Sequence, residues 1–307
     1  MHKSVLLESC LEYLNLGENS IIVDCTLGYA GHSSRILEKI TNGFLYCFDQ
    51  DNEAINYSQN KLAKIASNYE IIESNFVNLE CELKKRGIDG VDGILFDLGV
   101  SSPQLDEDYR GFSFHKDAPL DMRMNTKQEL SAYYVVNNYS SEELIKIFRD
   151  YGEEKYASSI AHKIVDCRKN KPVETTLELV EIIKSSVPEK YKREKHPARK
   201  VFQAIRIEVN HELDVFDSAL RQALELVNVG GRVCVITFHS LEDKICKNIF
   251  KEYSTVDKNI SKLPIIPDDL EPKFKVVATI SPDLKELEEN NRSRSAKLRV
   301  IERVKKG

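Results

Sequence analysis

Short hydrophobic runs recur along this chain, and each ends close to an Asp, Gly or Ser residue. Five of them are rich in β-branched or aromatic residues: 21–24, 44–49, 69–72, 93–97 and 233–238. Runs that are apolar at nearly every position are typical of strands buried on both faces, as in a parallel sheet. Two C-terminal segments, 275–280 and 297–304, could add strands at a sheet edge. The pattern therefore predicts an α/β fold built on a largely parallel sheet.

The fourth and fifth runs are separated by the 134 residues 98–231, far more than a crossover helix with short loops requires. Helical patterns fill this interval. Ser140–Glu143 has the sequence of a capping box, and apolar residues follow it at helical spacing. Thr175 or Thr176 caps a further helix, and Gly230-Gly231 is expected to end the last helix before the fifth strand. We therefore expect a discontinuous α/β domain interrupted by a helical insertion.

The composition is that of a globular protein. The chain has 307 residues, of which 41% are hydrophobic and 30% charged, enough apolar material for a sizeable core. No apolar run approaches the roughly 20 residues of a membrane span, and the N-terminus lacks the apolar stretch of a signal peptide. Seven scattered cysteines include no C-x-x-C pair, so we expect reduced thiols without a structural zinc site or a disulfide framework. These features indicate a cytoplasmic protein without a metal site.

The formal net charge of −5 by itself argues against a histone-like nucleic-acid binder. The placement of the charges changes this picture. Residues 190–206 hold seven Lys or Arg against one Glu, and so do residues 292–307, which leaves −17 on the remainder. Two such clusters in an acidic chain indicate phosphate-facing patches, although each alone could be a solvated face. The candidate RNA contacts are Lys192, Arg193, Lys195, Arg199, Lys200, Arg292 and Arg294.

Residues that could bind a ligand follow three of the strands at their carboxyl ends, where open α/β sheets bind ligands. Gly28, Ala30 and Gly31 lie in a turn that leads into a helix N-terminus, so a ligand could approach the backbone closely. The turn lacks the G-x-G-x-x-G spacing of dinucleotide sites, which favours a nucleoside without phosphates. Asp49 ends the second strand and could accept hydrogen bonds from both ribose hydroxyls, or could simply cap the next helix. Asp97 begins a third segment, which offers a carboxylate and hydroxyls to a reacting centre.

Three converging segments of this kind indicate S-adenosylmethionine as the ligand and a methyltransferase as the class of protein. Each segment alone could have a purely structural role: the glycine turn as a tight βα corner, Asp49 as an N-cap and the Asp97 segment as a capped turn. Three such roles at one edge of the sheet are a less good explanation than a shared ligand site. A nicotinamide-dependent oxidoreductase would share the sheet, and the missing G-x-G-x-x-G disfavours it. A non-enzymatic RNA-binding or ribosome assembly factor would have no need of Asp49, Asp97 and Gln104 together.

Longer sequence strings indicate a family. Nearly end to end, the chain resembles the RsmH (MraW) family of bacterial methyltransferases. The strings that carry the resemblance are 24–33, 97–106 (DLGVSSPQLD), 110–114 (RGFSF), 119–124 (PLDMRM), 151–154, 196–198, 202–204, 238–243 (FHSLED) and 292–299. The family acts on N4 of a cytidine in the 16S RNA of the small ribosomal subunit, near the decoding centre. The resemblance implies a Rossmann-like S-adenosylmethionine-dependent methyltransferase sheet (residues 1–104 and 205–307) with an inserted all-helical substrate-binding domain (residues 105–204).

The resemblance also implies where the cofactor binds. Carried over motif by motif, its contacts are Ala30, Gly31, His32, Asp49, Phe76, Asp97 and Gln104. Phe76 could pack on the adenine or could be a core aromatic. Asn125 stands where the family usually has Asp, and Arg199-Lys200 replaces a frequent Thr-Arg. Neither departure removes an expected cofactor contact.

Methyl transfer to an amine needs alignment and hydrogen-bond acceptors more than a covalent nucleophile. We expect Asp97 and Ser102, within the Ser101-Ser102-Pro103 turn, to be the catalytic residues that accept hydrogen bonds from the cytosine amine. Asp97 could instead serve the cofactor alone, and His239 is either a supporting residue or a structural histidine. The RNA must present an unpaired or flipped cytosine. The expected partner is thus 16S RNA or the small ribosomal subunit, with a DNA amino-methyltransferase as an alternative, and the sequence leaves monomer or homodimer open.

Overall fold

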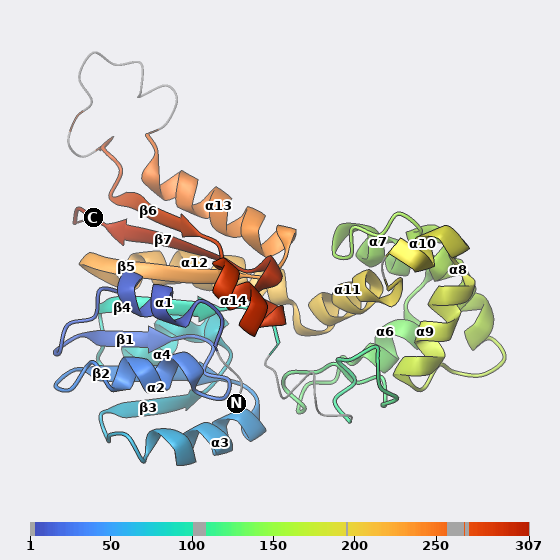
Figure 1. Cartoon of the computed structure of the whole chain (residues 1–307), viewed down its shortest axis with the longest axis horizontal. Helices are drawn as coiled ribbons and strands as arrows, with labels where there is room; N and C mark the ends of the chain where they lie inside the picture. The colour runs from blue at the N-terminus through green and yellow to red at the C-terminus, as the bar shows by residue number, and fades with distance from the viewer. Residues whose placement is uncertain (1–3, 101–108, 195, 257–266, 268–269, 307) are drawn as a thin grey trace. The chain divides into compact units, whose positions relative to one another are not determined.

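Two compact units make up the computed structural model of the chain (Figure 1). The structure describes residues 4–100, 109–194, 196–256, 267 and 270–306. One unit joins Met1–Gly99 to Leu213–Gly307 and carries the sheet, and the other, Val100–Glu212, is helical. The sheet unit is thus discontinuous in sequence, and its breaks lie after Gly99 and before Leu213 rather than at residues 104 and 205.

The described residues form a seven-stranded sheet in the order β3-β2-β1-β4-β5-β7-β6. The strands are β1 (Ile21–Asp24), β2 (Phe44–Asp49), β3 (Tyr69–Glu73), β4 (Val91–Asp97), β5 (Val227–Thr237), β6 (Phe274–Ile280) and β7 (Lys297–Arg303). Strands β1 to β5 run parallel, whereas β7 pairs antiparallel with both β5 and β6. This is the doubly wound order 3-2-1-4-5-6 with one antiparallel strand inserted. It confirms the expected Rossmann-like α/β fold and creates a topological switch point between β1 and β4.

Consecutive residues of the central strands alternate between two hydrophobic cores, one on each face of the sheet. The helices described in this unit are α1 (Leu7–Tyr13), α2 (Gly31–Leu37), α3 (Asn52–Leu62), α4 (Leu79–Lys85), α12 (Glu212–Leu226), α13 (Ser240–Ser254) and α14 (Leu284–Glu289). Ile22 and Leu95 share a core with α1 and α2. Val23 and Phe96 share the other core with α4, α12 and α13. Because both faces are covered, the strands are apolar at nearly every position, as their sequences predicted.

Strand β5 starts earlier than its sequence suggested. It begins at Val227, directly after α12, so Gly230-Gly231 lies inside the strand instead of ending a helix. Val91 of β4 pairs with Val227, and the register then shifts. A Cβ on Gly231 would come within 2.7 Å of the carbonyl oxygen of Asp92, so glycine permits this close strand contact. Pairing with a distant strand, rather than the local turn preference of two glycines, decides where β5 starts.

The helical unit has a hydrophobic core of its own. Its described helices are α6 (Ala132–Asn138), α7 (Ser141–Asp150), α8 (Ala157–Arg168), α9 (Thr176–Ser185), α10 (Glu189–Glu194) and α11 (Ala198–Asn210). The capping box predicted from the sequence is present at α7, where the side chains of Ser140 and Glu143 each accept the other's backbone N–H. Thr175 caps α9 in the same way. Helix α11 continues unbroken to Asn210, and its Val209 packs in this core, so the unit extends well past residue 204.

In the part of the chain that the structure describes, no helix is both long and apolar enough to cross a bilayer. The seven cysteines are free thiols, and five of them are buried. Among the described residues, no group of three or more His, Cys, Asp or Glu side chains is arranged to hold a metal ion.

Candidate active site

A tight turn joins β1 to α2 beside the switch point. Ala30, the residue before α2, has a left-handed backbone with φ of 52°. Asp24 at the end of β1 ties the turn to α2, because its carboxylate accepts a hydrogen bond from Oγ of Ser33 at 2.6 Å. Lys61 of α3 donates to the carbonyl oxygens of Tyr29 and Ala30 at 3.0 Å each. The turn is therefore held in one conformation from two sides.

The N-terminal segment Ser4–Leu6 lies against the start of α2. A Cβ on Gly31 would come 1.8 Å from Oγ of Ser4, so a larger residue here would require the Ser4 side chain to move. The carbonyl oxygen of Val5 lies 3.1 Å from Nε2 of the buried His32. In the structure the side chain of Ser4 lies beside Gly31, and the expected role of Gly31 at a ligand site stays a prediction.

Asp49 ends β2 and faces the turn. Its Oδ2 accepts a hydrogen bond from the N–H of Gly28 at 2.8 Å, and its Oδ1 accepts one from the N–H of Asp51 at 2.9 Å. Asp51 caps α3, because its side chain accepts from the N–H of Glu53, so Asp49 is not the N-cap that the sequence allowed. Burial raises the pKa of Asp49 to about 6, although the backbone hydrogen bonds oppose this shift. The carboxylate is thus fixed in place with lone pairs left for a ligand.

Phe76 follows β3 in the short 3-10 turn η1 (Phe76–Asn78) and is half-buried. Its ring meets Phe96 edge-on at the border of the core, with centroids 5.7 Å apart. The side chain of Asn75 holds this turn by accepting from the N–H of Val77, and it donates to Gln50 at 3.1 Å. Phe76 is therefore a core aromatic that still leaves ring surface open to a base.

Asp97 ends β4, across the switch point from Asp24. Its N–H donates to Oγ1 of Thr26 at 2.7 Å, and its Oδ2 lies 3.4 Å from Nδ1 of His32. Its buried Oδ1 has no hydrogen-bond partner within the described residues. Burial raises the pKa of Asp97 to about 6; His32 opposes this shift, and the carboxylates of Asp24 and Glu242 add to it. A buried acceptor with an unused oxygen and a raised pKa is typical of a functional carboxylate.

His239 follows β5 and caps α13. Its Nδ1 accepts from the N–H of Glu242 at 3.5 Å, and the Glu242 carboxylate accepts from the N–H of Phe238 at 2.7 Å. Nε2 of His239 also lies 3.1 Å from Oε1 of Glu242. Of the two roles that the sequence allowed, these contacts support the structural one. They also fix the buried Glu242, whose charge acts on Asp97.

The sheet unit places six of the expected cofactor residues along the carboxyl ends of β1 to β4: Ala30, Gly31, His32, Asp49, Phe76 and Asp97. The other expected site residues, Ser102 and Gln104, lie outside the described residues together with the Ser101-Ser102-Pro103 turn. A fixed carboxylate, a partly open aromatic ring and a buried acceptor without a partner suit a nucleoside cofactor that carries positive charge. The residues present therefore fit S-adenosyl-L-methionine.

The described candidate RNA contacts of the helical unit lie on α10 and at the start of α11. Lys192 pairs with Glu189 at 2.5 Å, and Lys200 donates to the carbonyl oxygen of Glu153 at 2.6 Å. Arg193 and Arg199 are exposed, and Lys195 lies outside the described residues. Part of this patch is therefore already engaged with neighbouring groups of the protein.

The C-terminal basic cluster of the sheet unit is smaller than its sequence suggested. Arg299 pairs with Asp243 at 2.8 Å, and Lys305 pairs with Glu271. Arg303 donates to the carbonyl oxygens of Glu225 and Val227. The candidate RNA contacts Arg292 and Arg294 both lie in the 3-10 turn η4 (Asn291–Ser295), where Arg294 is exposed and Arg292 half-buried. Counting charges along the chain overestimated the positive charge available to RNA, because several of these cations bind carboxylates or carbonyl oxygens of the protein itself.

Sequence reasoning missed an aromatic cluster beside α10. Nζ of Lys155 lies 5.0 Å from the ring centroid of Tyr156 and 4.7 Å from that of Tyr191. The hydroxyl of Tyr191 donates to the buried carboxylate of Glu154 at 2.6 Å. Aromatic rings next to cations are common on surfaces that bind single-stranded nucleic acid. The signal in the sequence was the alternation Lys190-Tyr191-Lys192.

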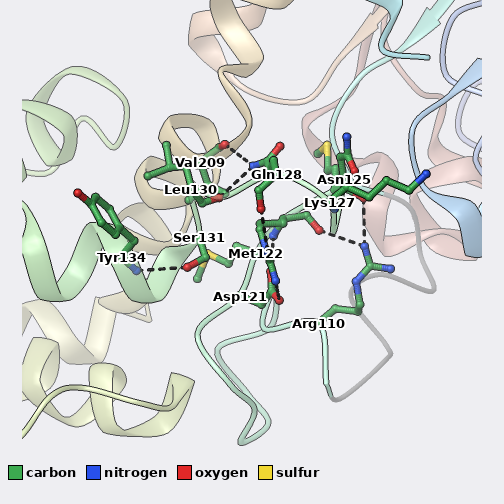
Figure 2. Close-up of polar contacts among 12 residues, drawn as sticks. Arg110, Asp121, Met122, Asn125, Lys127, Gln128, Leu130, Ser131, Tyr134 and Val209 are labelled. Atoms are coloured by element: carbon green, nitrogen blue, oxygen red, sulfur yellow. Dashed lines mark hydrogen bonds and ion pairs between the residues drawn. The ribbon is translucent and has the colours of Figure 1, made fainter. Parts of the chain in front are cut away.

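The family motif that begins at Arg110 forms a polar loop within the helical unit (Figure 2). The buried Arg110 donates to the carbonyl oxygen of Arg123 at 3.1 Å, and Arg123 pairs with Asp121 at 2.7 Å. Asn125, which departs from the family's usual Asp, accepts from the N–H of Lys127 at 2.9 Å. An Asp side chain would make the same bond. The departure therefore preserves the loop.

The model of the MraW methylase family matches residues 1–304. Ribosomal RNA small subunit methyltransferase H of Exiguobacterium sibiricum is 51% identical over 307 residues, which cover 99% of this chain and 98% of the relative. An rRNA methylase structure from Streptococcus thermophilus aligns over 99% of both chains, at 12% identity and a TM-score of 0.45. A Streptococcus mutans methyltransferase solved in complex with SAH aligns over 99% of both chains, at 13% identity and a TM-score of 0.44.

The family match and the sequence relative agree with the resemblance that the motifs carried. They confirm the expectation of a methyltransferase that uses S-adenosyl-L-methionine. This chain belongs to the MraW methylase family.

Proposed function

We propose that this protein methylates N4 of a cytidine in the 16S RNA of the small ribosomal subunit, near the decoding centre, in the cytoplasm. The observation that carries the proposal is the unused Oδ1 of Asp97, a buried acceptor beside the switch point of the sheet. The name of the 51% identical relative supports a small-subunit ribosomal RNA as substrate. The choice of cytidine N4 rests on the family resemblance of the motifs.

Seven residues would hold the cofactor: Ala30, Gly31, His32, Asp49, Phe76, Asp97 and Gln104. Asp49 would accept hydrogen bonds from the ribose hydroxyls, because its carboxylate is fixed by backbone N–H groups at the end of β2. Phe76 would pack against the adenine with its open ring surface. When bound, S-adenosyl-L-methionine supplies a methyl group made electrophilic by the sulfonium, so the protein needs no covalent nucleophile.

Asp97 would act on the substrate amine. The cytosine amine is a poor nucleophile, because its lone pair is delocalised into the ring. An acceptor that binds one amine N–H favours a pyramidal nitrogen and can take the proton when the new bond forms. Burial raises the pKa of Asp97 to about 6, not far below neutral pH, which suits a group that takes and releases a proton. We assign Oδ1 of Asp97 to this role, with Ser102 as a second acceptor.

Replacement of Asp97 tests this assignment. Asp97→Ala should abolish methyl transfer to small-subunit RNA even when S-adenosyl-L-methionine, whose affinity for the variant is measured by calorimetry, is kept saturating. Asp89→Ala is the control, because Asp89 is an exposed carboxylate of the same unit. If Asp97→Ala mainly weakens cofactor binding, and saturating cofactor restores the rate, the acceptor role is wrong.

The substrate is tested in cells. Mass spectrometry of small-subunit RNA from cells that lack this protein should show the loss of N4-methylcytidine, and expression of the wild-type chain should restore it. An unaltered N4-methylcytidine content would exclude the proposed substrate. Restoration by the Asp97→Ala variant would exclude the proposed role of Asp97.

The RNA surface is tested through salt dependence. Replacing Lys192, Arg193 and Lys195 by Gln should weaken RNA binding and reduce the slope of log K against log salt by roughly 0.7–0.9 for each phosphate that the variant no longer neutralises. Lys84→Gln/Lys85→Gln is the matched control, because both lysines are exposed on α4 in the sheet unit and pair with neighbouring glutamates. An unchanged slope in the triple variant would show that α10 does not face the phosphates.

A further inference from the structure

His32 makes a contact that determines which of its ring nitrogens carries a proton. The side chain is buried in the first turn of α2, with only 5% of its surface exposed. Its Nε2 lies 3.1 Å from the carbonyl oxygen of Val5. A carbonyl oxygen only accepts hydrogen bonds, so Nε2 must be the donor. In a neutral imidazole this leaves Nδ1 as a bare acceptor.

That bare nitrogen faces a carboxylate. Nδ1 of His32 lies 3.4 Å from Oδ2 of Asp97. Two acceptors at this distance repel each other unless a further proton lies between them. The pair therefore holds one proton more than a neutral imidazole and a carboxylate together. That proton belongs either to an imidazolium beside a carboxylate or to a carboxylic acid beside a neutral imidazole.

The groups around the pair determine how its charge is balanced. Two other carboxylates act on Asp97, that of Asp24 from β1 and that of Glu242 from α13. The nearby Cys10 of α1 contributes no charge, because burial raises the pKa of its thiol well above its ordinary value. Among the described residues that act on Asp97, only His32 favours its charged form. Without it, an acidic neighbourhood and burial would leave Asp97 protonated more of the time.

We propose that His32 is a positioning residue for methyl transfer, which holds the extra proton against Oδ2 so that Asp97 remains a carboxylate with Oδ1 left for the substrate amine. This inference rests on the proposed function of Asp97. In the transfer, the amine lone pair forms the new N–C bond, and the sulfonium C–S bond breaks with its electron pair left on sulfur. The N–H proton passes to Oδ1 of Asp97, and the pair then releases one proton to solvent.

The N-terminal segment takes part in this arrangement. Val5 accepts the Nε2 proton, and the segment is fixed because Leu6 donates its N–H to Glu286 at 2.6 Å. Ser4 fills the space that Gly31 leaves open. The main-chain carbonyl of Val5 thus keeps the proton of the neutral imidazole on Nε2. Nδ1 can then carry a proton only if that proton is shared with the carboxylate of Asp97.

The resting protein allows a direct test that needs no substrate. In ¹⁵N NMR of histidine-labelled wild-type protein, we expect Nε2 of His32 to carry a proton throughout pH 5–8. The Nδ1 resonance should change when Asp97 is replaced by Asn, because the carboxylate that shares its proton is gone. A proton on Nδ1 with a bare Nε2 at neutral pH would overturn the proposal, whatever reaction the protein catalyses.

The pH profile of transfer provides the second test. In His32→Gln, the side-chain amide can still donate to Val5 but carries no charge. With saturating S-adenosyl-L-methionine, we expect the acid limb of the single-turnover rate to move to higher pH, with about a tenfold loss at pH 6.5 that shrinks above pH 8. His162→Gln, an exposed histidine on α8, is the matched control and should leave the profile unchanged.

The outcomes separate the possible failures. A uniform loss at every pH with an unshifted profile would show that His32 only packs against the N-terminal segment, and it would overturn the proposal. Loss of cofactor affinity alone, measured by calorimetry, would assign His32 to the cofactor and would also overturn it. If the NMR result is as expected but no cytidine is methylated, the proton-sharing pair stands and the proposed function fails.

Discussion

Replacing Asp97 by Asn should stabilise the protein, and the gain should grow with pH. Burial raises the pKa of Asp97 to about 6 from an ordinary value of 3.8. The folded state therefore binds this proton more tightly than the unfolded state does. The resulting stability is fully present below pH 3.8 and is lost as the pH rises through about 6. Asn is neutral at every pH and close in shape, so it removes this loss.

The size of the effect follows from the two pKa values. Their difference is about 2.2, and each pKa unit corresponds to about 1.36 kcal/mol, so full ionisation of Asp97 costs about 3 kcal/mol above pH 7. At pH 5 the same two pKa values imply a cost of about 1.6 kcal/mol. The side chain is 26% exposed, so solvent screening makes these figures upper bounds. The advantage of Asn should thus grow by about 1 kcal/mol between pH 5 and pH 8.

Urea unfolding of the wild-type and Asp97→Asn proteins, without cofactor, measures this difference at pH 5, 6, 7 and 8. Circular dichroism is the suitable probe, since the chain has no tryptophan. Asp243→Asn is the control. Hydrogen bonding to Arg299 lowers the pKa of Asp243, so the stability that the Asp243 carboxylate contributes is lost only well below pH 5. The cost of the control variant should therefore be constant from pH 5 to pH 8. A pH-independent difference for Asp97→Asn would refute the burial argument.

Three further predictions concern the framework of the two units. Gly111 and Gly87 share φ of +72°, but a Cβ on Gly111 would lie 2.4 Å from a carbonyl oxygen, whereas one on Gly87 would meet nothing within 4 Å. In urea unfolding, Gly87→Ala should cost about 1 kcal/mol and Gly111→Ala about 1–3 kcal/mol more, and equal costs would contradict the clash. Ser140→Ala removes the α7 cap and should cost about 1 kcal/mol in the same assay, while no change would mean that the cap adds nothing. Lys61→Met frees the carbonyls of the turn after β1, so calorimetry should show several-fold weaker cofactor binding, and unchanged affinity would mean that the turn needs no such support.

Local patterns in the sequence predicted much of the fold, because they depend on neighbouring residues. Near-continuous apolar runs marked β1 to β5, and the C-terminal strands β6 and β7 were expected close to their positions in the sequence. The capping box at Ser140 was predicted from two residues three positions apart and is present. Strand β5 was the exception, since Gly230-Gly231 has turn chemistry and yet lies inside the strand. Its distant partner β4 outweighs the local preference.

The chemistry of the candidate site divides in the same way. The sequence by itself determined the family, and it marked Asp49 and Asp97 as acidic residues at strand ends. It could not show that Asp49 leaves the capping of α3 to Asp51, or that Arg299 is neutralised by Asp243, which lies 56 positions away. Nor could it show that the Val5 carbonyl contacts His32, or that Oδ1 of Asp97 has no hydrogen-bond partner among the residues that the structure describes. Strand and helix patterns arise from short-range periodicity and capping, whereas hydrogen-bond partners and charge pairing arise only when distant segments meet, so the tertiary structure decides them.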